Sequence, residues 1–433
     1  MAARRIVLLG IDSVSLEWLQ TFVRRGVMPH LRRLMNGGVV SPMTSFYPVD
    51  TGTNWASIAT GASPMVHGCN MQMHLPGEPL DRRVSSFPSE YLRGEPIWLT
   101  AQRAGRTAVV FDWPHSYPLH LAERILHVGE DGRPDNAIRA IQEVRAYATQ
   151  PPHRPEGAGQ QNQRQHLLPV ALSPAAAGGD AAWRNLPAES QGGALPILSA
   201  ELPIVPGPKS RYQQVDSLWA LVWPEGSGYG RVSIHATRDA ADPLAAVRLG
   251  ERSPSVRHTF RTDAGAVAAA FQVKLLRLSP DGRELHLYLT EIYPTADFAH
   301  PADLATQLLE VAGPFVAQPS RQQVVLGGAS DIATYFEEQV NQGAWYERAL
   351  RHVLGTREWD VCLLKWHSLD WTNHLFAYAT EPRHPLYDPA REPEAWAYWD
   401  RLFAQADRMV GAAWEAAQSG GRDAVLALTS DHG

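Results

Sequence analysis

Residues that can bind a metal ion follow three apolar runs of the sequence. They are Asp12 after VLLGI, Asp370 after VCLLKWHSL with His374 four positions later, and Asp431 and His432 after AVLALTS. Ligands of an open parallel sheet bind outside the carboxyl ends of its strands, so we expect these side chains to share one edge. Carboxylates and imidazoles together suit zinc or manganese. The three places therefore predict a metal site.

Each of these pieces also has a simpler interpretation. A single Asp after a strand, such as Asp12, is commonly a turn or helix-cap residue. The spacing of Asp370 and His374 puts both on one face of a helical turn, where a solvated pair would also lie. Asp431 and His432 before a glycine also fit a plain turn. Only their coincidence at one sheet edge favours a joint site.

A fourth element with chemical potential is the segment YPVDTGTNWASIATGASPMVHG, residues 47–68. Its polar residues 50–54 precede an amphipathic helical pattern over residues 55–60. The amides and the positive dipole end at a helix N-terminus favour a bound phosphate or an alkoxide. The alternative is that Thr51 or Thr53 only caps the helix.

The elements that must position these residues alternate between strands and helices. Residues 5–11, RIVLLGI, form a continuous apolar run typical of a strand buried on both faces, and a helical pattern follows. Three later pairs repeat the alternation as helix then strand, over residues 95–104 and 107–111, 332–354 and 360–364, and 394–418 and 424–429. This order predicts an α/β fold with a mostly parallel sheet and helices on both faces.

The middle of the chain differs in composition. We expect residues 1–150 and 331–433 to form the two parts of the α/β core, with an insert at 151–330. The insert is rich in Pro, Gly, Gln and Ala to about residue 206, which predicts a loop or linker. Beyond it, apolar runs flank the turns PEGSGYG and SPDG, at 217–223 with 231–235 and at 268–278 with 284–292. These patterns predict antiparallel β hairpins.

Composition excludes several classes of function. The 433 residues include 39 Lys and Arg against 45 Asp and Glu, a formal charge of −6, so no nucleic-acid polymer is expected as a partner. The two cysteines, Cys69 and Cys362, cannot build a disulfide framework or a Cys-rich zinc site. No run approaches the roughly 18 apolar residues of a membrane span. With an N-terminal apolar run too short for a signal peptide, we expect a cytoplasmic protein.

Taken together, the motifs GID, YPVDTGTNWASIATGASPMVHG, DWTNH and SDHG resemble the type I phosphodiesterase/nucleotide pyrophosphatase family of the alkaline phosphatase superfamily. The resemblance runs from residue 10 to the end of the chain, and no motif of the family falls within the insert at 151–330. It implies an alkaline phosphatase-like core and a hydrolase of phosphodiester or pyrophosphate bonds. The expected partner is a small-molecule phosphate ester.

The resemblance also implies roles for individual residues. It assigns one divalent ion to Asp12, Asp431, His432 and the hydroxyl of Thr51, and a second ion to Asp370 and His374. Zinc is the expected metal, with manganese as the alternative. Thr51 matches the nucleophile, which would form a phosphothreonine intermediate, and Asn54 matches the amide that binds a phosphoryl oxygen. His67 is expected to be structural.

The chain departs from the family pattern in two places. Gly52 and Thr53 stand where the family often has Phe-Pro or Ala-Pro, so a nucleotide preference does not transfer. The family continues beyond its Asp-His-Gly and supplies a further histidine to the second ion, whereas this sequence ends at Gly433. We therefore expect a C-terminally truncated member with an incomplete second part of the core. His115, in FDWPHSYP, is the candidate to replace the missing histidine.

Other functions stay open at this point. The chain could be a catalytically impaired or non-catalytic relative that acts as a binding module, or a phosphomonoesterase or phosphomutase-type relative. A sulfatase would need Cys or Ser followed by Pro and Arg at the nucleophile, a pattern that is absent here. Diester, pyrophosphate, phosphonate and monoester substrates share such a metal site, and fold analogy does not choose among them. The oligomeric state is also open.

Overall fold

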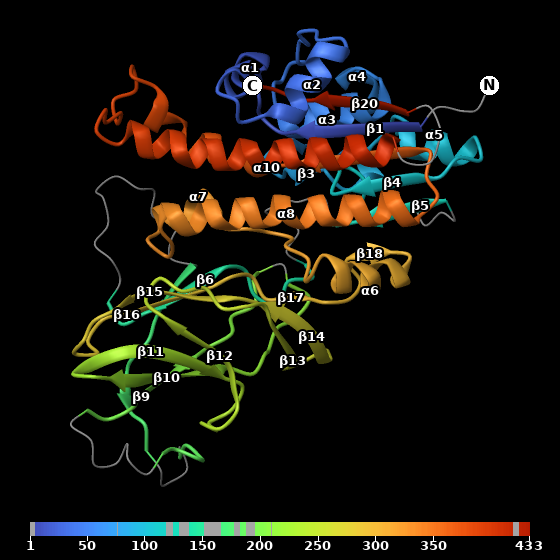
Figure 1. Ribbon diagram of the computed structural model, residues 1–433. Helices are drawn as coiled ribbons and strands as arrows, with labels where there is room; N and C mark the ends of the chain where they lie inside the picture. Colours follow the sequence, from blue (N-terminus) through green and yellow to red (C-terminus); the bar gives the residue numbers. More distant parts are fainter. Residues whose placement is uncertain are drawn as a thin grey trace. The chain divides into compact units, whose positions relative to one another are not determined.

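The computed structural model describes residues 5–433 except for position 76 and the ranges 118–123, 130–137, 151–165, 177–181, 188–194, 209 and 419–423. The chain forms two compact units (Figure 1). The core unit comprises Met1–Arg133, Asp297–Ala317 and Gln339–Gly433, and the second unit comprises Pro134–Ala296 and Gln318–Glu338. Residues 134–150, which the sequence assigned to the core, group with the second unit because their strand β6 (Arg145–Ala148) pairs with β16 (Leu285–Leu289).

The core unit contains one six-stranded sheet with its helices and a two-stranded ribbon. Its strands are β1 (Arg5–Ile11), β2 (Gln72–Met73), β3 (Val84–Ser85), β4 (Ala108–Phe111), β5 (Ile125–Val128), β18 (Ala299–His300), β19 (Val361–Trp366) and β20 (Ala424–Thr429). Its α-helices are α1 (Leu16–Arg24), α2 (Pro29–Gly37), α3 (Thr51–Thr60), α4 (Pro64–His67), α5 (Ile97–Arg103), α6 (Ala302–Val311), α9 (Ser368–Phe376) and α10 (Glu392–Gln418). Short 3-10 turns cover Ser89–Tyr91 and Ala377–Thr380, and the unit boundary falls within α8 (Ile332–Thr356).

The main sheet has the strand order β18-β5-β4-β19-β1-β20. All neighbours pair in parallel except β18, which is antiparallel to β5. Strand β1 lies between β19 and β20, with Leu9 in register with Leu364 on one side and Leu428 on the other. This confirms the predicted α/β fold, and it explains why residues 6–11 are apolar.

Helices cover both faces of this sheet. On one face, Leu8 of β1 and Leu363 of β19 pack with Trp55 of α3 and Trp98 of α5. The opposite face carries the alternate residues, including Trp366 of β19. A Cβ atom on Gly343 of α8 would contact both Trp366 and Gln405 of α10, so α8 and α10 lie on that second face. The two predicted helix layers are therefore present.

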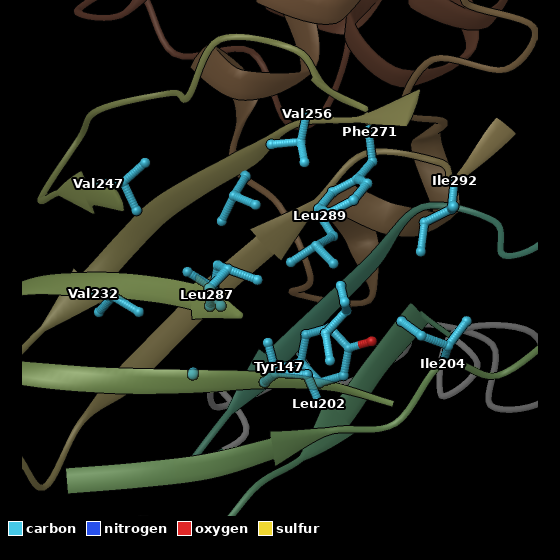
Figure 2. Packing of buried hydrophobic residues seen from close by; sticks show 14 of the residues in the cluster. Tyr147, Leu202, Ile204, Val232, Val247, Val256, Phe271, Leu287, Leu289 and Ile292 are labelled. Atoms are coloured by element: carbon cyan, nitrogen blue, oxygen red, sulfur yellow. The ribbon is translucent and has the colours of Figure 1, made fainter. Parts of the chain in front are cut away.

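The second unit is built mainly from antiparallel sheets. Its strands outside those already named are β7 (Leu167–Pro169), β8 (Ser173–Pro174), β9 (Leu198–Leu202), β10 (Leu218–Glu225), β11 (Gly228–His235), β12 (Pro243–Arg248), β13 (Val256–Thr262), β14 (Gly265–Phe271), β15 (Val273–Leu278) and β17 (Tyr293–Pro294). The short helix α7 (Gln322–Leu326) also belongs to it. Figure 2 shows side chains of these sheets meeting in one apolar cluster, with Tyr147, Leu202 and Leu287 among them.

The hairpins of the insert are those predicted from the sequence, but the bounds of its strands differ from the prediction. The hairpin of β10 and β11 and that of β15 and β16 are antiparallel, as predicted. The run 268–278 is two strands rather than one, because residues 265–271 turn to pair with β13. The predicted loop to residue 206 contains β9, which pairs with β10 through alternating buried positions; the rest of 151–206 lies partly outside the described residues.

Within the described ranges, no helix combines the length and the apolar character that crossing a bilayer would need.

Gly10 of β1 is required by the packing of α3. A Cβ atom at this position would overlap the six-membered ring of Trp55, which is fully buried. We expect Gly10→Ala to lower the free energy of unfolding by about 1–3 kcal/mol, as overpacking of a dense core does. Gly355→Ala is the matched control, since nothing lies within 4 Å of its added atom. Chemical denaturation of both variants tests this, and equal stability of the two would contradict it.

Candidate active site

The ends of three neighbouring strands converge at one edge of the main sheet. The backbone N–H of Asp12, just after β1, donates to the carbonyl of Trp366 at the end of β19, at 3.1 Å. The next N–H, that of Ser13, donates to Asp431 Oδ1 beyond β20, at 3.2 Å. Parallel pairing therefore brings Asp12, Asp431 and the start of α9 together, as the strand-end rule predicts.

Asp12 is fully buried, and its two carboxylate oxygens have different surroundings. Oδ2 accepts a hydrogen bond from Trp55 Nε1 at 3.1 Å and lies 2.9 Å from Lys365 Nζ and 2.5 Å from His367 Nδ1. Oδ1 is buried and accepts no hydrogen bond from the described residues. Burial tends to raise the pKa of Asp12, but Lys365 and His367 outweigh it and hold the pKa well below its usual range.

The free oxygen of Asp12, Oδ1, lies near His432, which in turn lies close to Asp431 and Thr51. His432 Nε2 lies 3.7 Å from Asp12 Oδ1, 3.3 Å from Asp431 Oδ2 and 3.5 Å from Thr51 Oγ1. Asp431 Oδ2 is also buried and accepts no hydrogen bond from the described residues. Two carboxylates, a hydroxyl and an imidazole nitrogen thus meet at one place.

The electrostatics of this group fit a divalent cation. Burial raises the pKa of Asp431 well above its usual value, and the neighbouring Asp12 carboxylate raises it further. A cation between the two carboxylates would remove this like-charge penalty and satisfy both unused oxygens. Asp12, Asp431 and His432 also form one of the groups within the described ranges whose ligand atoms lie within 4.8 Å of one another. The donor set suits zinc or manganese.

Thr51 is the first residue of α3 and is not its cap. The N-cap is Asp50, whose side chain accepts a hydrogen bond from the N–H of Thr53 at 2.7 Å. The alternative in which Thr51 or Thr53 caps the helix is therefore wrong. Because Asp50 performs that role, the hydroxyl of Thr51 is left to face His432.

Asn54 holds the segment before α3. Its Oδ1 accepts from the N–H of Phe46 at 2.7 Å, and its Nδ2 donates to the carbonyls of Phe46, Pro48 and Asp50 at 3.1–3.4 Å. The amide predicted to bind a phosphoryl oxygen thus contacts backbone groups here. Its observed contacts fix the path of residues 46–50 and so the position of Thr51.

Asp370 and His374 lie on α9 with the predicted helical spacing. His374 Nε2 is 3.5 Å from Asp370 Oδ1, and its side chain is 64% exposed. On the other side of Asp370, His367 Nε2 lies 3.4 Å from Oδ2. The second group of metal-ligating residues within the described ranges is Asp12, His367 and Asp370, without His374.

Two other histidines from the sequence have structural surroundings. His115 is fully buried, with Nδ1 3.2 Å from the carbonyl of Ser86 and Nε2 3.0 Å from that of Gly52. Both ring nitrogens are engaged by the backbone, so the suggestion that His115 replaces a metal ligand is wrong. His67 accepts from the N–H of Cys69 and lies 2.9 Å from Ser57 Oγ, which joins α4 to α3.

Sequence reasoning missed three residues of the site. They are Lys365, His367 and Trp55, all of which contact Asp12 Oδ2. A signal was available for Lys365, because it is a charged residue within a strand that is otherwise apolar and buried throughout, VCLLKW. A lysine in such a place requires a buried partner, and that partner is Asp12.

Comparison with known proteins supports the resemblance over the first third of the chain. The family model described as type I phosphodiesterase / nucleotide pyrophosphatase matches residues 6–161, which include Asp12 and Thr51. Member 3 of the ectonucleotide pyrophosphatase/phosphodiesterase family from Mus musculus is 33% identical over 116 residues, which is 26% of this chain and 13% of that protein. Member 1 from Homo sapiens is 33% identical over 115 residues, 25% of this chain and 12% of that protein.

Similar solved structures include phosphonoacetate hydrolase from Sinorhizobium meliloti 1021 in complex with phosphonoformate. It is 29% identical with a TM-score of 0.25, covering 28% of this chain and 31% of that one. The family match confirms the predicted resemblance for residues 6–161. Asp370, Asp431 and His432 lie outside the matched range, so their place in the site is supported by geometry.

The contacts of Asn54 lead to a prediction about local stability. Asn54→Ala removes the acceptor of the Phe46 N–H and leaves it without that bond, a loss of about 1–2 kcal/mol. We expect hydrogen exchange at the Phe46 amide to accelerate roughly tenfold. Asn373→Ala is the control, because the Asn373 amide donates to Ser13 instead. Unchanged exchange at Phe46 in the Asn54 variant would show that this segment is held by other contacts.

Proposed function

We propose, from the type I phosphodiesterase resemblance of residues 6–161, that the protein is a metal-dependent hydrolase of phosphoric esters that uses Thr51 as its nucleophile. Phosphodiester or pyrophosphate bonds are the proposed targets. The observation that supports this best is the meeting of Asp12 Oδ1, Asp431 Oδ2 and Thr51 Oγ1 within 3.7 Å of His432 Nε2. The chain spans only 13% and 12% of the length of the relatives named above, so their activity enters here as a proposal.

The ion of this proposal would be held by Asp12, Thr51, Asp431 and His432, with zinc as the first choice and manganese as the second. When bound, a divalent ion lowers the pKa of a coordinated hydroxyl and stabilises negative charge that develops in the reaction. The resemblance implies another ion at Asp370 and His374. The proposal made here requires only the one beside Thr51.

The chain's own residues would then act in two steps. The Thr51 hydroxyl gives its proton to water as its oxygen forms a bond to phosphorus. The bond to the leaving oxygen breaks, that oxygen takes up a proton from water, and a phosphothreonine results. Water then attacks the same phosphorus, the bond to the Thr51 oxygen breaks, and the threonine is restored. Backbone amides in the first turn of α3, other than that of Thr53, which donates to Asp50, would hold phosphoryl oxygens. Asp50 and Asn54 would keep that helix end and the segment before it in position.

Replacing the nucleophile tests the reaction. We expect Thr51→Ala to lower the rate of bis-p-nitrophenyl phosphate hydrolysis, measured with added zinc or manganese, by at least roughly a thousandfold. Thr53→Val is the matched control, since Thr53 is a buried threonine of the same helix. We expect it to keep most of the activity. Near wild-type turnover by the Thr51 variant would contradict the proposal, and ion binding without turnover by the wild type would favour a binding module.

Replacing His432 tests the ion itself. We expect His432→Ala to lose most of the ion that the wild type retains after dialysis, as measured by elemental analysis. A chelator should also lower the thermal midpoint of the wild type, because an ion at 100 times its Kd stabilises the fold by about 2.7 kcal/mol. The exposed His384 provides the control, His384→Ala, which should behave as wild type. Equal ion content in both variants would contradict this site.

A further inference from the structure

We propose that the ammonium group of Lys365 takes the place of a second divalent ion, so that the site binds one divalent ion together with one fixed lysine cation. The inference rests on the proposed function, because it concerns the same cluster of residues. The family resemblance implies two divalent ions at this cluster, whereas this inference has one. It follows from where Lys365 lies and from what its neighbours are already bonded to.

Lys365 is held inside the cluster by two contacts. Its side chain is 2% exposed, and its Nζ lies 2.9 Å from Asp12 Oδ2 and 2.7 Å from His367 Nδ1. Taking an ammonium group out of water is costly unless a carboxylate compensates for it. Asp12, which is itself fully buried, provides that carboxylate. The lysine is therefore a fixed part of the site, because its side chain is buried and its Nζ lies against Asp12.

Lys365 already contacts two of the three residues that could hold a second ion. The candidate group there is Asp12, His367 and Asp370. Lys365 already contacts Asp12 Oδ2 and His367 Nδ1, which leaves His367 Nε2 beside Asp370. The remaining predicted ligand, His374, is mostly exposed. A divalent ion bound here would sit beside a buried positive charge, and the repulsion between them is strong where water is excluded.

The buried unused oxygens mark one ion position. Asp12 Oδ1 and Asp431 Oδ2 are buried without a hydrogen bond from the described residues, and both face His432. Asp370 differs from them, because its side chain is 9% exposed and its two oxygens lie 3.4 Å from His367 Nε2 and 3.5 Å from His374 Nε2. The charges agree with a single ion. One divalent ion and one ammonium group carry three positive charges, and the carboxylates of Asp12, Asp370 and Asp431 carry three negative charges.

Lys365 would act through Asp12 and is a positioning residue. By binding Oδ2 together with Trp55, it leaves Oδ1 on the side of His432. Its ammonium group also places a positive charge next to Asp12 when no second ion is bound. Its removal should change how many ions the protein binds, which a merely structural lysine would not do.

Counting bound ions tests the inference. We would titrate the full chain with Zn²⁺ by calorimetry and measure the metal retained after gel filtration. The wild type should bind one ion per chain. Lys365→Met removes the buried positive charge from Asp12 Oδ2 and His367 Nδ1 beside Asp370, and we expect its stoichiometry to rise to two. Lys274→Met is the matched control: Lys274 is also buried and paired, with Glu337 of the second unit, and its variant should still bind one ion.

The outcomes separate this inference from the proposed function. Two ions in the wild type would overturn the role of Lys365 and leave the hydrolase proposal standing. One ion in Lys365→Met would also overturn it, provided circular dichroism shows a folded protein. No ion in the wild type would overturn both. If Lys365→Met does not fold, anomalous diffraction from wild-type crystals grown with zinc decides: one peak at Asp12 and His432 supports the inference, and a second at Asp370 refutes it.

Discussion

The site depends on one buried carboxylate, Asp12, whose two oxygens serve different purposes. Oδ2 is saturated by Trp55, Lys365 and His367, while Oδ1 is left beside Asp431 and His432 without a hydrogen bond from the described residues. A buried charge with one unsatisfied oxygen is costly. The same arrangement is stable when a cation sits opposite that oxygen. The geometry of Asp12 is therefore the strongest physical reason to expect a metal ion here.

The fold holds Asp12 in this state through its strand and its neighbouring helix. Strand β1 pairs with β19 on one side and β20 on the other, which fixes the position of Asp12 directly after it. Gly10 leaves room for the ring of Trp55, whose Nε1 then reaches the carboxylate. The same helix, α3, presents Thr51 at its start. The packing of Trp55, the carboxylate of Asp12 and the proposed nucleophile Thr51 are thus coupled, and a shift in one would move the others.

The family match and the sheet pairing each cover part of the site. The family match covers residues 6–161 and so includes Asp12 and Thr51. The partners Asp431 and His432 lie near the other end of the sequence and outside that match. They join Asp12 through the parallel pairing of β20 with β1.

The sequence by itself determined the strand and helix framework of the core and the residues at its strand ends. Continuous apolar runs and a helical spacing are local signals, and they located β1, β19, β20, α8 and α10 closely. Only the tertiary structure decided which polar groups pair. The contact of Lys365 with Asp12 and the burial of His115 against Gly52 join segments far apart in sequence. Such pairings depend on the order of strands in the sheet and on which of several donors binds one oxygen. Neither can be predicted from the spacing of residues along the sequence.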